Sequence, residues 1–200
     1  NRKQTQLMDF EDIQHIVYQD ILGKLPDHLT YHNLDHTKYV LDRAIFLGIE
    51  SDVEAKDLEL LKLAALFHDT GFIDNPKDHE EKGCRIAKGY LAQEYSEDEL
   101  EKIFGMIMAT KIPQSPNNHL EKILADADLE YLGTDHFEEI GQTLYQELKH
   151  FNPTFSERAW DELQLVFLEK HHFHTEYCRI HREPKKQENL LKVKKRLGLA

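Results

Sequence analysis

The chain has 200 residues, of which 40% are hydrophobic, so one domain can bury a sizeable core without disulfides. A formal net charge of -12 excludes general nucleic-acid binding, which depends on clustered lysine and arginine side chains. Two cysteines without metal-ligand spacing and no apolar run of membrane-spanning length predict a cytoplasmic protein with neither a disulfide framework nor a membrane partner.

Amphipathic helix is the predicted state of nearly every segment, because apolar residues recur at three- and four-residue spacing. The predicted helices cover about residues 8–25 and 34–47, a third segment that follows Ser51 or Asp52 and carries the apolar run 58–67, then residues 78–90, 97–109, 119–132, 134–149 and 156–181, with a last basic helix from Pro184. Gly48 is expected to end the second helix, and Ser51 or Asp52 to cap the third. No repeat or linker indicates a second domain. We therefore expect an all-α, single-domain bundle over residues 1–200, with helices over 134–197 packed on a core over 31–132.

The first polar motif is Tyr-His-Asn-Leu-Asp-His at residues 31–36. His32 and His36 are four positions apart, so on a helix they lie within roughly 5–6 Å on one face. Two imidazoles placed in this way can share a site. Considered alone, the pair is explained more simply as solvated or capping histidines.

The second motif is His68-Asp69, which follows the most apolar helix of the chain. A lone His-Asp pair is uninformative. Two polar groups at the end of a buried helix nevertheless need partners, because an unpaired buried polar group is costly. A metal ion is one such partner.

The third motif is Asp126-Ala-Asp128, which interrupts a pattern of core residues. An exposed acidic face or an ion pair with Lys122 would also explain it. Together the three motifs supply two imidazoles and two carboxylates, a set suited to Mn²⁺, Fe²⁺, Zn²⁺ or Mg²⁺ rather than to metals that prefer thiolates.

In this order the motifs resemble the signature H…HD…D of the HD-domain metal-dependent phosphohydrolases. The similarity spans about residues 31–132, and it rests on Tyr-His-Asn-x-x-His, Leu-Phe-His-Asp-Thr-Gly and Asp-Ala-Asp-Leu. It implies a helical bundle of the HD type that binds a divalent ion (Mn, Fe, Zn, Mg or Ni). The metal ligands that it implies are His36, His68, Asp69 and Asp128, with Asp126 as the alternative to the last.

The same resemblance implies catalytic residues. His32 corresponds to the histidine that protonates the leaving oxygen in cyclic-nucleotide phosphodiesterases of the superfamily, a step suited to an imidazole. Asp69 is expected to act in catalysis as well as in metal binding. Because the chain is acidic overall, Lys111, Lys82 or Arg85 is expected to help the ion to supply positive charge for the phosphate. His79 is either a ligand of a second metal or of phosphate, or a surface histidine. Lys111 replaces a histidine that several subfamilies use for a second ion, which disfavours a two-ion site.

The predicted activity is hydrolysis of a phosphoester in a nucleotide-like small molecule by a metal-activated water. The Tyr-His-Asn motif favours a phosphodiesterase, with phosphomonoester or pyrophosphate cleavage as alternatives. The signatures of alarmone hydrolases and of cyclic-dinucleotide phosphodiesterases are both absent. A catalytically silent sensor that binds nucleotide or metal is the competing hypothesis, and a homo-oligomer is compatible with the sequence.

Two further patterns lie in the C-terminal third. On a continuous helix, four side chains would share one face and form a zinc or copper site, unless they only border a packing surface: His171, His174, Cys178 and His181. The basic residues of the last helix are expected to form a solvated face rather than a surface for RNA or membranes: Lys185, Lys186, Lys192, Lys194, Lys195 and Arg196.

Overall fold

The computed structural model describes residues 8–74 and 76–200, and every regular element within them is helical. The all-α prediction is therefore confirmed. In chain order the elements are α1 (Phe10–Ile16), the π-helical η1 (Val17–Ile21), the short turn η2 (Leu22–Lys24), α2 (Leu34–Glu50), α3 (Ala55–Phe67), η3 (Thr70–Ile73), α4 (His79–Leu91), α5 (Glu97–Ala109), α6 (His119–Leu129), η4 (Glu130–Gly133), α7 (Phe137–Phe151), α8 (Glu157–Lys170), α9 (Glu176–His181) and α10 (Glu183–Leu197). None of these helices combines the length and apolarity needed to cross a bilayer.

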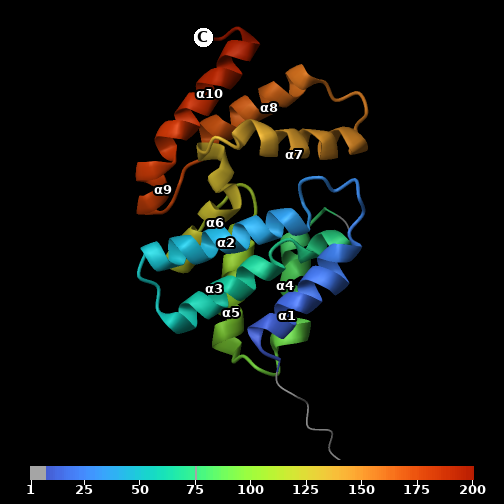
Figure 1. Ribbon diagram of the computed structural model, residues 1–200, viewed down its shortest axis with the longest axis vertical. Coiled ribbons are helices and arrows are strands. Elements are labelled where there is room, and N and C mark those ends of the chain that lie inside the picture. Colours follow the sequence, from blue (N-terminus) through green and yellow to red (C-terminus); the bar gives the residue numbers. More distant parts are fainter. Residues whose placement is uncertain (1–7, 75) are drawn as a thin grey trace, which may run out of the picture.

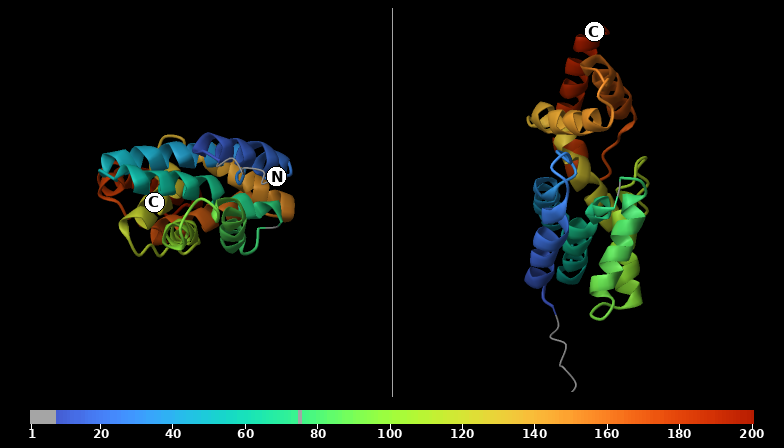
Figure 2. Two further views of the ribbon diagram at one scale, coloured as in Figure 1. Left: turned by 90° about the horizontal axis from the view of Figure 1, so that it is seen from below. Right: turned by 90° about the vertical axis from the view of Figure 1, so that its right-hand side faces the viewer.

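Two groups of helices stack along the long axis of the molecule (Figure 1). Helices α1 to α5 form one group, and α7 to α10 form the other. Helix α6 begins against α2 and α5 and, through η4, leads the chain into the second group. The same division is visible from the side (Figure 2). The site described below lies where the two groups meet.

Helix α3 is the central helix, as its sequence predicts. Its side chains from Leu63 to Phe67 are completely buried, because α2, α4, α5 and α6 surround it. Burial of this much apolar surface stabilises the fold and fixes the end of the helix. The residues that follow Phe67 therefore leave a rigid element in a defined direction.

A second apolar cluster attaches the C-terminal helices. Tyr31 and residues of η4 pack there against Phe137 of α7, Leu168 of α8 and Val193 of α10. The C-terminal helices thus bury their apolar faces on the segment that follows α6.

The predicted end of α2 is wrong by three residues. Helix α2 continues through Gly48 to Glu50. A Cβ atom at Gly48 would lie 2.8 Å from the Cδ1 atom of Leu58. The glycine is therefore used for the close approach of α3, not for a helix terminus.

The predicted cap of α3 is also wrong. The helix begins after Glu54, which makes no side-chain cap. Asp52 instead has a φ of 54°, in the left-handed region. Aspartate tolerates this conformation better than most residues, so Asp52 reverses the chain between α2 and α3.

The basic face of α10 is only partly solvated. Lys192 and Lys195 are exposed as expected, but Lys194 and Arg196 pair with acidic residues of α8. Lys186 is only 1% exposed, and its ammonium donates to the backbone carbonyl of His171 at 2.6 Å. For Lys186 the prediction of a solvated side chain is wrong.

Candidate metal centre

The loop before α2 sets the direction of its first histidines. Asn33 is the N-cap residue, and its Oδ1 accepts a hydrogen bond from the backbone N–H of His36 at 3.1 Å. Its amide nitrogen donates to the carbonyls of Leu29 and Thr30. These bonds satisfy a free donor of the helix and fix the loop. His36 consequently lies in the first turn of α2, facing the end of α3.

His68 and Asp69 follow the buried helix α3 directly. The Nδ1–H group of His68 donates to the carbonyl of Ala65 at 2.7 Å. This bond fixes the ring and leaves Nε2 as the nitrogen with a free lone pair, the usual arrangement of a metal-binding histidine. His68 is fully buried and Asp69 is 4% exposed.

Four side chains converge from α2, the end of α3 and α6. Asp128 Oδ1 lies 3.0 Å from His36 Nε2 and 3.4 Å from His68 Nε2. Asp69 Oδ2 lies 3.5 Å and 3.3 Å from the same two nitrogens. Ligand atoms about 2.1 Å from a common ion are separated by roughly 3.0 Å in octahedral and 3.4 Å in tetrahedral geometry. The distances from each carboxylate to the two histidine nitrogens therefore suit ligands of one ion, and the ligand atoms of His36, His68 and Asp69 all lie within 4.8 Å of one another.

Two buried atoms of this cluster lack a hydrogen-bond partner: His68 Nε2 and Asp69 Oδ2. An unsatisfied buried polar atom costs about 1–3 kcal/mol. A divalent ion would satisfy both atoms and would also offset the charge of the two carboxylates. The residues present thus fit a divalent metal.

The carboxylates and the histidines stabilise each other's charged forms. Burial favours a protonated Asp128, but the hydrogen bond from His36 and the nearby imidazole of His68 outweigh it and lower the pKa of Asp128 to about 2. Burial favours a neutral His68, but Asp69 and Asp128 raise its pKa well above the usual value. When no ion is bound, a proton on His68 offsets part of the negative charge of the two carboxylates. A bound metal ion would take over this part.

Asp126, the alternative ligand, binds elsewhere. Its carboxylate accepts hydrogen bonds from the backbone N–H groups of His174 and Thr175, and from the hydroxyl of Thr175 at 2.7 Å. Residues two apart on a helix point to nearly opposite sides. The geometry therefore favours Asp128 as the ligand and gives Asp126 the task of fixing the segment before α9.

His32 lies beside the cluster and is held by a residue that the sequence did not single out. Its Nδ1 is 2.6 Å from Oε2 of Glu147 on α7, which is 3% exposed. The ring stacks on Phe72 at a centroid distance of 4.1 Å. Nε2 remains as the nitrogen available for proton transfer. The one signal in the sequence was an acidic residue on the helical face of Ile140 and Leu144.

A family model described as HD domain matches residues 33–132, half of the chain. The chain belongs to the HD domain family. Proteins of this family are typically metal-dependent hydrolases. The match contains all four residues of the metal cluster, and it excludes His32 and Glu147.

The fold of this HD-domain protein is also found in a solved structure. A predicted HD superfamily hydrolase from an uncultured Thermotogales bacterium is similar, with a TM-score of 0.63. The two are 20% identical, and the alignment covers 94% of this chain and 91% of the other. At this identity the similarity shows a shared fold. Comparison with curated proteins gave no match.

His79 lies in the site of this HD-domain protein and not on an open surface. Its Nε2 is 3.4 Å from Asp69 Oδ1 and 3.3 Å from Glu80 Oε1, and its Nδ1–H donates to the carbonyl of Pro76. Burial lowers the pKa of His79, but the Asp69 carboxylate outweighs this effect and raises it. His79 thus connects the second oxygen of Asp69 to α4.

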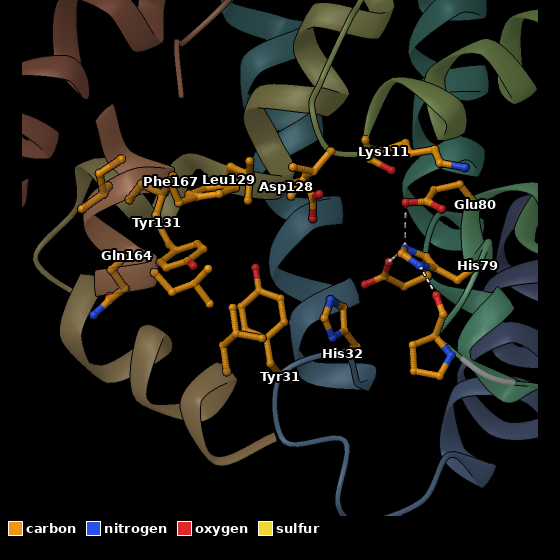
Figure 3. A pocket seen from close by; sticks show the side chains of 18 of the residues that line it. Tyr31, His32, His79, Glu80, Lys111, Asp128, Leu129, Tyr131, Gln164 and Phe167 are labelled. Carbon is orange, nitrogen blue, oxygen red and sulfur yellow. Dashed lines mark hydrogen bonds and ion pairs between the residues drawn. The ribbon is translucent and has the colours of Figure 1, made fainter. Parts of the chain in front are cut away.

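Lys111 lies near Glu80 (Figure 3), and its ammonium group is paired with acidic residues. Nζ lies 2.5 Å from Glu81 Oε1 and 3.6 Å from Asp78 Oδ1. Figure 3 shows the side chain near Glu80, with its nitrogen directed away from Asp128. The ammonium group of Lys111 therefore faces Glu81 and Asp78 and not the metal cluster.

The second histidine-rich segment does not form a metal site. Helix α8 ends at Lys170, and residues 171–175 are not helical, so the prediction of a continuous helix is wrong. The reason is tertiary, because Lys186 binds the carbonyl of His171 and Asp126 binds the N–H groups that follow. Within residues 8–74 and 76–200, the side chains close enough together to hold an ion are those of the cluster described above, His36, His68 and Asp69, with Asp128 beside them.

A cavity of about 480 Å³ opens beside the metal cluster (Figure 3). This volume lies within the range of roughly 300–1,000 Å³ of small-molecule pockets. Asp69 and Asp128 reach the cavity from the cluster, and His32, His79 and Lys111 also line it. All the catalytic residues predicted from the sequence thus border one space.

Proposed function

We propose that this HD-domain protein is a metal-dependent phosphohydrolase, which transfers the phosphoryl group of a small phosphate ester to water. His36, His68, Asp69 and Asp128 are the proposed ligands of the ion. The observation that carries the proposal is the convergence of these side chains, two of them with unsatisfied buried atoms, at the floor of a cavity. Phosphodiester, phosphomonoester and pyrophosphate cleavage can all use this arrangement, and the sequence favours a diester of a nucleotide-like substrate.

The ion, when bound, lowers the pKa of water and offsets negative charge on the phosphoryl group. The protein supplies the proton transfers. His32 donates a proton from Nε2 to the leaving oxygen as its bond to phosphorus breaks. Glu147 holds the imidazole through Nδ1, and Asp69, fixed by His79, orients the attacking water. Lys111 can bind the phosphate only if its ammonium leaves Glu81.

The proposal is tested by metal analysis and turnover measured on the same samples. Purified protein would be stripped with chelator, reloaded with Mn²⁺, Fe²⁺, Zn²⁺, Mg²⁺ or Ni²⁺, and assayed for product against a panel of phosphate esters. His68→Ala should lose both bound metal and turnover. The control is His136→Ala, at an exposed histidine that does not line the cavity. Hydrolysis by metal-free His68→Ala would contradict the mechanism, and ligand binding without product from any metal form would favour a sensor.

A further inference from the structure

The cavity has two halves of opposite chemistry. Its charged lining residues lie in the half that contains the metal cluster (Figure 3), among them Asp69, His79 and Asp128. The half formed by η4, α7 and α8 has no charged lining residue in the described part of the chain. In Figure 3 Phe167, Leu129 and Tyr131 lie at one end, and His79, Glu80 and Lys111 at the other. We name the uncharged half the apolar chamber, with these main walls: Leu132, Phe137, Leu144, Trp160, Leu163 and Phe167.

Few polar groups line the apolar chamber: the hydroxyls of Tyr31 and Tyr131 and the amide of Gln164. The amide nitrogen of Gln164 donates to Asp161 at 3.3 Å. A nucleobase carries several donors and acceptors, and a wall made mainly of hydrocarbon side chains would leave most of them without a replacement for their water. A hydrocarbon group loses nothing of this kind and gains from burial.

The apolar surface also continues to the outside. Leu163 and Ile112 line the cavity and are 48% and 55% exposed. Exposed large apolar residues next to a cavity are typical of a binding site for an apolar ligand. An amphipathic molecule could therefore enter with its hydrocarbon along this rim and its anionic head toward the metal cluster.

We infer that the substrate is a phosphate ester of an apolar alcohol, whose alkyl or aryl group occupies the apolar chamber. The inference rests on the proposed function and specifies its substrate class in place of a nucleotide. A water oxygen bonds to phosphorus and releases one proton to solvent, and the ester P–O bond breaks with its electron pair on the alcohol oxygen. That oxygen takes the proton of His32, and the phosphate and the free alcohol leave.

The test uses Trp160, the one tryptophan of the chain and a wall of the chamber. Metal-loaded protein is titrated with n-alkylphosphonates from methyl to octyl, which cannot be hydrolysed at their P–C bond, while tryptophan emission is followed. We expect emission to change with the longer chains, and Kd to fall by about fourfold per added methylene until the chamber is filled. Nucleoside 5′-monophosphates should bind no better than methylphosphonate. Tight nucleotide binding with no dependence on alkyl length would overturn the inference.

Two matched variants locate the effect. Leu163 and Val166 both lie on α8 and are 48% and 49% exposed, so neither change should prevent folding. Leu163 borders both the chamber and a smaller neighbouring cavity, whereas Val166 borders only the smaller one. Leu163→Gln should raise the Kd of octylphosphonate by about tenfold and leave the Kd of methylphosphonate unchanged. In Val166→Gln, Kd should still fall with alkyl length as in the unchanged protein. Equal Kd values in the two variants would refute the placement of the alkyl chain in the chamber.

Turnover separates this inference from the proposed function. The metal-loaded protein is assayed with n-alkyl phosphates, with their methyl diesters and with nucleotides. Chain-dependent binding without hydrolysis of any ester would leave the chamber inference standing and refute the phosphohydrolase. Efficient hydrolysis of nucleotides, with no increase in rate with alkyl length, would support the phosphohydrolase and refute the chamber inference. Hydrolysis that becomes faster with chain length supports both.

Discussion

The imidazole of His32 and the carboxylate of Glu147 lie 2.6 Å apart, although 115 positions separate them in the chain. Glu147 belongs to α7, outside the segment that the HD family model matches. The C-terminal helices therefore do more than cover the bundle. Helix α7 holds the proposed proton donor, and α7 and α8 form walls of the apolar chamber together with η4.

Glu147→Gln should lower kcat by about tenfold to a hundredfold and change KM little, because the amide holds the His32 ring less firmly. The pH dependence of kcat should also change, which a purely structural role would not produce. Glu139→Gln, at an exposed position of the same helix, is the control. An unchanged pH profile in Glu147→Gln would argue against a positioning role.

Asp128→Asn and Asp126→Asn should have different effects. Asp128→Asn removes a proposed ligand, so bound metal should fall sharply in elemental analysis. Asp126→Asn should keep its metal but lose about 2–4 kcal/mol of unfolding free energy, because the amide cannot accept all the hydrogen bonds from His174 and Thr175. Denaturant unfolding of both variants would be measured beside the metal content. Metal loss in Asp126→Asn alone would reverse the assignment.

Gly71→Ala and Gly89→Ala should change stability in opposite directions. A Cβ atom at Gly71 would lie 1.9 Å from the carbonyl oxygen of His79, so the start of α4 must move. We expect a loss of about 1–3 kcal/mol and weaker metal binding. Gly89 has no neighbour within 4 Å of a Cβ atom, and alanine there should add about 0.5–1 kcal/mol. Thermal unfolding of both variants measures this difference.

His171 should make the protein less stable in acid. Burial, together with the charge of Lys186, lowers its pKa from the usual 6.5 to about 3. Between these two pKa values the unfolded chain binds a proton that the folded protein does not. The unfolding free energy should thus fall by up to about 1.4 kcal/mol per unit as the pH decreases from 6.5 toward 3. His171→Gln should reduce this slope in urea unfolding, whereas His172→Gln, at an exposed neighbour, should not.

Local patterns were sufficient to predict some parts of this protein. The helical period predicted the all-α fold and the burial of α3, since both follow from the spacing of apolar residues along one segment. The motifs predicted His36, His68, Asp69 and Asp128, which the structure brings together. Their residue types and order limited the chemistry before any geometry was known.

Contacts between distant segments decided the rest. Gly48 was predicted as a helix end, but it serves the approach of α3. The helix predicted through His171 is interrupted because Asp126 and Lys186 bind its backbone. The roles of Glu147 and of the apolar chamber depend on where α7 and α8 pack. The sequence by itself determined which side chains are able to bind a metal ion and transfer a proton, because that is a property of each residue and its local spacing. Only the tertiary structure decided which partner each side chain meets and which walls enclose the substrate, because packing brings together residues that no local pattern relates.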